Sequence, residues 1–181
     1  MLLLWLLGCM ARPELHLLAV GGTHLIDGAG ACQLIGAEPA DAVQDLHWSN
    51  ALALQAQKVG TAEVACGAEH RTLQLVAPAH LEVARTDGGG TLAVGQRISV
   101  RARLTDSQNR ELEVGQYTEI AWSASATLQS ANDPSAGEFG LCDTCFGQQA
   151  YLVVGEGPAT VEARLGGLVG TLAVGVGVTG R

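Results

Sequence analysis

Aromatic residues and clusters of basic residues are both scarce in this chain of 181 residues. Phe, Trp and Tyr make up 4% of it, and Lys plus Arg number 10 against 18 Asp plus Glu, which gives a formal net charge of −8. Nucleic-acid binding rests on basic groups that neutralise phosphates, and anionic membrane surfaces attract the same groups. Because no basic cluster occurs, we expect no nucleic-acid partner and no electrostatic attachment to a membrane.

Catalytic motifs are missing as well. No serine lies in a G-x-S-x-G turn, and the Gly-rich stretches at 21–23 and 166–170 lack the Lys-Ser/Thr pair of a phosphate-binding loop. The histidines are scattered beside expected strands, and we expect all five on the surface: His16, His24, His47, His70 and His80. The sequence therefore predicts a protein that is not an enzyme and that holds no cofactor and no metal ion.

The residues that are present favour β-structure. Hydrophobic residues make up 48% of the chain, which is enough for folded cores, and the 24 glycines gather at expected turns. Apolar and polar residues alternate with a period of two over 97–104, 159–165 and 172–178, as they do in half-buried strands. Short strands separated by turn residues predict an all-β fold built from antiparallel sheets.

An internal repeat divides the chain. Residues 45–49, Asp-Leu-His-Trp-Ser, align with residues 119–123, Glu-Ile-Ala-Trp-Ser. Downstream, residues 60–66 align with residues 157–163, and each copy then closes with an apolar strand. A repeat of this kind predicts two tandem copies of one fold.

The repeat sets the expected domain boundaries. The first copy covers 14–77 and the second 79–178, with Pro78 at the join and almost no linker between them. Trp48 and Trp122 take equivalent places in the repeat. We expect both tryptophans in the core of their copies, in preference to a role in stacking on carbohydrate.

The second copy carries a family resemblance. Its matching segments are 92–96 (Leu-Ala-Val-Gly-Gln), the turn at 104–106, the Trp122 strand at 120–123, and the strands at 157–163 and 174–178. In this combination it resembles the bacterial immunoglobulin-like (Big-type) domains of surface proteins. The resemblance implies an immunoglobulin-like β-sandwich, and the repeat extends that expectation to a divergent first copy.

The first copy has Cys32, Trp48 and Cys66 in the order found in immunoglobulin domains, where a disulfide between the two sheets packs on a buried tryptophan. In the second copy Ala163 takes the place of Cys66, so this bridge is absent there. The first copy is short for a sandwich of seven strands, and we expect it to lack one or two of them.

The N-terminus resembles a lipoprotein signal. An apolar run ends in Leu6-Leu7-Gly8-Cys9, like a bacterial lipobox, although no Lys or Arg precedes it. Such a run is too short to cross about 30 Å of hydrocarbon, so it is interpreted as an export signal. The resemblance implies a signal peptide over 1–8, a palmitate-bearing lipid anchor on Cys9 and a tether over 9–13. Met10 replaces the Asp that signals inner-membrane retention, which implies the outer membrane.

Lipidation of Cys9 would leave four cysteines, which allow three pairings into two disulfides. Local pairing of Cys142 with Cys145 is the simplest, and Cys32 would then pair with Cys66. The C-x-x-C spacing also occurs in thiol oxidoreductases and zinc sites. Here it lacks a βαβ context and a second half of a zinc ligand set, so a structural disulfide is favoured.

Residues 130–147 lie between two expected strands as a long excursion, and long ordered loops often carry function. This loop is the first candidate for a binding site. We expect a non-enzymatic envelope lipoprotein that acts as a structural or adhesive surface module, with a membrane, other envelope proteins or surface glycans as partners. The alternatives are a small-ligand or metal-binding envelope protein that uses this loop, and an accessory domain of a longer surface protein, because the sequence stops just after its last strand.

Overall fold

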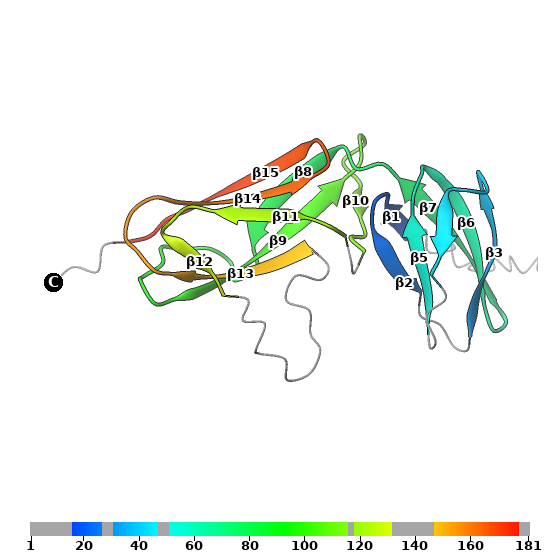
Figure 1. Ribbon diagram of the computed structural model, residues 1–181, viewed down its shortest axis with the longest axis horizontal. Coiled ribbons are helices and arrows are strands. Elements are labelled where there is room, and N and C mark those ends of the chain that lie inside the picture. Colours follow the sequence, from blue (N-terminus) through cyan, green and yellow to red (C-terminus); the bar gives the residue numbers. More distant parts are fainter. Residues whose placement is uncertain (1–15, 27–30, 47–50, 116–117, 132–146, 178–181) are drawn as a thin grey trace, which may run out of the picture.

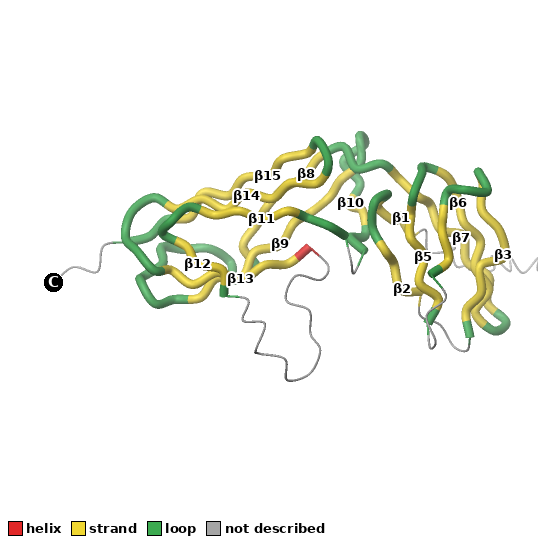
Figure 2. The backbone as a smooth tube through the Cα atoms, viewed as in Figure 1, coloured by secondary structure: helices red, strands yellow, loops and turns green. Residues whose placement is uncertain are grey.

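The computed structural model describes residues 16–26, 31–46, 51–115, 118–131 and 147–177 (Figure 1). Within these ranges the regular elements are β-strands and no α-helix occurs, which confirms the all-β fold class (Figure 2). No helix in the described part is long and apolar enough to span a membrane. The strands form two β-sandwiches that follow each other along the longest axis of the molecule.

The first sandwich contains the strands β1 to β7. One sheet has the order β1-β7-β6-β3 and the other has the order β2-β5-β4. β1 runs parallel to β7, and the other pairs are antiparallel. The strands are β1 (His16–Ala19), β2 (Thr23–Ile26), β3 (Cys32–Glu38), β4 (Val43–Asp45), β5 (Leu52–Ala56), β6 (Gly60–Cys66) and β7 (Glu69–Val76).

This strand order is that of an immunoglobulin-like sandwich, with three strands in one sheet and four in the other. The expectation that the first copy lacks one or two strands was therefore wrong. Short strands explain the difference, because β4 has three residues and β1 and β2 have four each. A complete seven-strand order thus fits into a short stretch of chain.

A disulfide joins Cys32 and Cys66. This is the pairing that we expected if Cys142 bonds locally to Cys145. Its place in the fold differs from the expectation. The two cysteines are direct cross-strand partners on β3 and β6 of one sheet, with Cα atoms 4.0 Å apart, and the bridge does not connect the two sheets. The separation is shorter than the usual range because directly opposed residues on adjacent strands lie closer than residues of facing sheets.

The second sandwich contains the strands β8 to β15. One sheet has the order β10-β9-β13-β12, with β8 on the other edge of β9, and the second has the order β11-β14-β15. The strands are β8 (His80–Arg85), β9 (Arg97–Thr105), β10 (Glu111–Leu112), β11 (Ala121–Ala124), β12 (Leu128–Ser130), β13 (Gln148–Val153), β14 (Ala159–Leu165) and β15 (Leu168–Val174).

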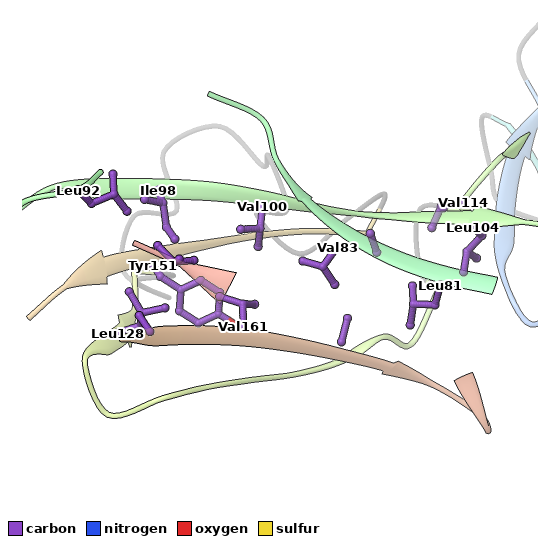
Figure 3. Packing of buried hydrophobic residues seen from close by; sticks show 14 of the residues in the cluster. Leu81, Val83, Leu92, Ile98, Val100, Leu104, Val114, Leu128, Tyr151 and Val161 are labelled. Atoms are coloured by element: carbon purple, nitrogen blue, oxygen red, sulfur yellow. The ribbon is translucent and has the colours of Figure 1, made fainter. Parts of the chain in front are cut away.

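The alternation seen in the sequence places the second core. On β9, Ile98, Val100 and Leu104 are at most 1% exposed, while Arg97 and Arg103 face solvent. Figure 3 shows these apolar side chains meeting residues of the facing sheet, among them Val161 of β14. Period-two alternation is thus a reliable guide to the buried face of these strands.

The downstream part of the internal repeat, together with the apolar strand that closes each copy, matches strands of equal position. β6 and β14 occupy the same place in their sandwiches, as the alignment of 60–66 with 157–163 predicts. Trp122, however, lies on β11, whose counterpart is β3, whereas residue 48 follows β4 in the chain. The alignment of residues 45–49 with residues 119–123 therefore does not follow the order of the strands in the two sandwiches.

We predict that replacing Cys32 and Cys66 together by Ala lowers the free energy of unfolding by about 3–4 kcal/mol in the chain-entropy model. The reason is that the bridge closes a loop with a sequence separation of 34 and so restricts the unfolded chain. Denaturant unfolding of the oxidised proteins measures the change. A reductant should weaken the unmodified protein more than the double variant, and equal stability of both oxidised proteins would contradict the prediction.

Candidate functional site

The strand β1 is buried on both of its faces, and this places it between the two sandwiches. Leu18 is 1% exposed and belongs to the core of the first sandwich. Its neighbours Leu17 and Ala19 point the other way and pack into the core of the second sandwich, where Val76 at the end of β7 joins them. A strand covered on both faces needs an uninterrupted apolar run, and residues 17–20 read Leu-Leu-Ala-Val.

Backbone hydrogen bonds also cross between the sandwiches. The Glu113 N–H donates to Leu17 O at 2.8 Å, and the Ala19 N–H donates to Glu113 O at 3.1 Å. These bonds form a parallel bridge between Leu18 and Glu113, so the free edge of β1 pairs with the segment that follows β10. We call this contact the seam. Residues 17–23 form its first side, and residues 113–115 and Thr118 form its second side.

Two glycines let the backbones approach closely at the seam. A Cβ atom on Gly115 would lie 2.6 Å from Thr23 O and 2.8 Å from Thr23 N, which are backbone atoms of the first sandwich. A Cβ atom on Gly22 would lie 2.5 Å from Thr118 Oγ1. Thr118 is itself buried, and its hydroxyl donates to Gly115 O at 2.9 Å. The seam is therefore packed too tightly to accept a side chain at Gly115.

His24 lies beside the seam and is 1% exposed, so its expected place on the surface was wrong. Its Nε2 lies 3.1 Å from Ala19 O. A carbonyl oxygen only accepts, so Nε2 carries the proton and Nδ1 is a bare acceptor, which has no hydrogen-bond partner in the described part. Burial lowers the pKa of His24, against smaller opposing effects of the Ala19 carbonyl and of Glu113. The imidazole is therefore held in its neutral form.

A small pocket of about 190 Å³ opens at the seam, below the usual range of about 300–1,000 Å³ for ligand sites. His16, Arg71 and Glu113 provide its charged or titratable lining, and three leucines and an isoleucine of β1, β2 and β7 provide the rest. Arg71 also forms an ion pair with Glu69 at 2.9 Å. The pocket is thus a gap beside the packed strands, and its size does not favour a role as the main site.

Several residues singled out from the sequence lie outside the described part: Cys9, Trp48, Cys142, Cys145 and residues 132–146 of the candidate loop. Their disulfide, lipidation and binding roles stay predictions. Trp122 is described, and it is half-buried against the core of the second sandwich. Among the described residues, no group of three or more His, Cys, Asp or Glu could hold a metal ion.

The seam is the feature that the sequence interpretation missed. Pro78 indicated a close join, but which surfaces meet was not predicted. The usable signal was the apolar run at 17–20, because it shows no alternation although short alternating strands make up most of the chain. Chemically the seam contains apolar contacts and backbone hydrogen bonds, and its effect is to hold two sandwiches in one relative orientation.

Similarity to known proteins is distant. No protein-family model matches the chain, and no curated protein is similar to it in sequence. Among solved structures, domains 4 and 5 of the S-layer protein SbsC align at 16% identity over 81% of this chain and 77% of theirs, with a TM-score of 0.35.

Two further structures show how varied the similar proteins are. The Yersinia pseudotuberculosis adhesin InvE aligns at 16% identity over 89% of this chain and 51% of its own, with a TM-score of 0.38. A glycosyl hydrolase family 2 member from Bacteroides cellulosilyticus aligns at 12% identity over 71% and 19%, also with a TM-score of 0.38. Similarities with such low sequence identities and TM-scores do not indicate a function for this chain.

We predict that Gly115→Ala lowers the free energy of unfolding by about 1–3 kcal/mol, because the new methyl group must displace the backbone at Thr23. Gly175→Ala is the matched control, since a Cβ there meets nothing within 4 Å. Denaturant unfolding measures stability, and small-angle scattering measures the arrangement of the two sandwiches. If the two variants behave alike, the tight packing at the seam is refuted.

We predict that protonation of His24 at low pH lowers the free energy of unfolding. Its pKa is lowered in the folded state, so below about pH 6.5 the unfolded chain binds a proton that the folded protein resists. The free energy of unfolding should therefore be level above that pH and fall as the pH drops from about 6.5 towards 5. His24→Gln should remove this part of the fall, whereas the exposed control His70→Gln should keep it. Identical pH profiles for all three proteins would contradict the assignment.

Proposed function

We propose that this chain is a non-enzymatic structural or adhesive module of a bacterial surface, built to hold two immunoglobulin-like sandwiches in a fixed tandem. The observation that carries the proposal is the seam. Leu17 and Ala19 of the first sandwich complete the core of the second, and backbone hydrogen bonds to Glu113 fix their register. A spacer or a platform for adhesion needs this constancy of shape, since its task is to present a surface at a set distance.

The disulfide supports an extracytoplasmic location. Disulfides form and persist in oxidising compartments and are rare where thiols are kept reduced, so a Cys32–Cys66 bridge fits an exported protein. An export route is provided by the proposed signal peptide over 1–8. The lipobox-like residues 6–9 support a lipid anchor on Cys9, and Met10 supports the outer membrane as its destination.

The anchor constrains how the module would stand on a membrane. Only residues 10–15 separate Cys9 from β1, and β1 lies at the seam. We propose that the membrane is the primary partner through the acyl chains, and that other envelope proteins or surface glycans contact the sandwiches. One acyl chain gives only weak, reversible binding, so stable anchoring requires the several chains of a mature bacterial lipoprotein.

The test is expression of the full chain in a Gram-negative host, followed by fractionation and intact-mass measurement. We expect the protein in the outer-membrane fraction with a mass that corresponds to cleavage before Cys9 and addition of acyl chains. Cys9→Ser should be unprocessed and unacylated. A membrane-associated protein with an unmodified Cys9, or a protein retained in the cytoplasm, would contradict the proposal.

A further inference from the structure

The second sandwich is closed along one side and open along the other. On the closed side β15 lies against β8 so tightly that a Cβ atom on Gly170 would be 2.7 Å from Leu81 O. On the other side β11 and β12 are the edge strands of their two sheets, and no further described strand lies beyond either of them. Among the described strands, the β11 and β12 edges are therefore where the space between the two sheets can open to solvent.

A groove of about 420 Å³ lies at this open side, within the usual volume range of small-ligand sites. Trp122, Ser123 and Ala124 of β11 line one wall, and Leu128 of β12 lines the other. Ser130, Gln149 and Tyr151 of β12 and β13 complete the lining. We call it the mouth groove.

Two polar side chains of the mouth groove lie on the inward face of their sheet, where the neighbouring residues are apolar. Gln149 pairs in register with Val100, and Ser130 pairs with Tyr151, so both polar residues share the inward face of their sheet with core residues. Gln149 is 6% exposed, and its Nε2 donates to Ser130 Oγ at 2.9 Å. The amide and the hydroxyl place uncharged hydrogen-bonding groups in the groove, which a ligand with hydroxyl groups can use.

Two hydrogen-bond donors in the mouth groove have no partner among the described residues. Neither the Trp122 indole N–H nor the Tyr151 hydroxyl bonds to any described residue. Tyr151 is 3% exposed, yet His24 Nδ1 is the only buried side-chain polar atom left unpaired in the described part. The Tyr151 hydroxyl must therefore reach the open space of the groove. Burial raises the pKa of Tyr151, so the hydroxyl keeps its proton and remains a donor.

The chemistry of the lining selects the kind of ligand. None of the residues that line the mouth groove is charged, so nothing there would neutralise a phosphate or a carboxylate. The half-buried ring of Trp122 offers an aromatic face, and Ser130, Gln149 and Tyr151 offer uncharged donors and acceptors. A ligand with one apolar face and a rim of hydroxyl groups matches this set.

We propose that the mouth groove is a binding subsite for a neutral sugar ring, which stacks on Trp122 and hydrogen-bonds to Ser130, Gln149 and Tyr151. The subsite goes beyond the proposed role as a surface module. It depends on the second sandwich alone and not on the lipid anchor or the seam. A negative result in the lipidation test therefore does not contradict the sugar subsite. Absence of sugar binding likewise does not contradict the proposal of a lipid-anchored module.

The test uses the full chain with Trp5→Phe and Trp48→Phe, so that Trp122 is the only fluorescent indole. Maltotriose, cellotriose and triacetylchitotriose are titrated in turn as neutral probes, with trigalacturonic acid as the acidic comparison. We expect a saturable change in Trp122 emission with at least one neutral probe, with a dissociation constant on the order of 1 mM or tighter. We expect none with the acidic probe.

Variants then locate the binding. Ala124→Arg fills the mouth groove from an exposed position and should weaken binding at least about tenfold, measured by calorimetry. Ala126→Arg is the matched control, because Ala126 is exposed nearby and does not line the groove, and it should bind normally. Trp122→Phe should retain the fold and bind more weakly. Absence of binding by every neutral probe, or unchanged binding by Ala124→Arg with an intact unfolding transition, would overturn the proposal.

Discussion

Burial of β1 on both faces is the constraint on which the rest of the arrangement depends. Alternate residues of one short strand belong to two different cores, with Leu18 in the first and Leu17 and Ala19 in the second. Separating the sandwiches would expose apolar surface of both cores and leave the backbone at Glu113 without its partners. The two sandwiches are thus coupled by the same forces that fold each of them, and the short link around Pro78 only keeps the chain continuous.

The first sandwich is fixed at both edges of its larger sheet. In the order β1-β7-β6-β3, one edge strand pairs across the seam and the other is held to β6 by the Cys32–Cys66 bridge. Edge strands are the weak parts of small β-proteins, because their unpaired backbone groups invite exchange and aggregation. The seam and the disulfide therefore complement each other, and together they let seven short strands form a stable unit. In the second sandwich no described strand covers the β11 and β12 edges, and the mouth groove lies there.

Some of this could be predicted from residues alone. Alternation identified the buried face of β9 and β14, and cysteine counting favoured the Cys32–Cys66 pair. The failures concern long-range pairing. Which strand Trp122 corresponds to, and whether the disulfide lies within a sheet, depend on strand order, which local patterns do not encode. The burial of His24 was missed for a related reason, since the surface that covers it comes from the seam.

Residual dipolar couplings of backbone N–H groups, measured in a weakly aligned sample of the full chain, test the fixed tandem most directly. They report the orientation of each sandwich relative to one alignment frame. If β1 couples the sandwiches as described, couplings from β1–β7 and from β8–β15 fit a single alignment tensor with the relative orientation of the structure. Two tensors of clearly different magnitude would show that the sandwiches move independently, and would contradict the account.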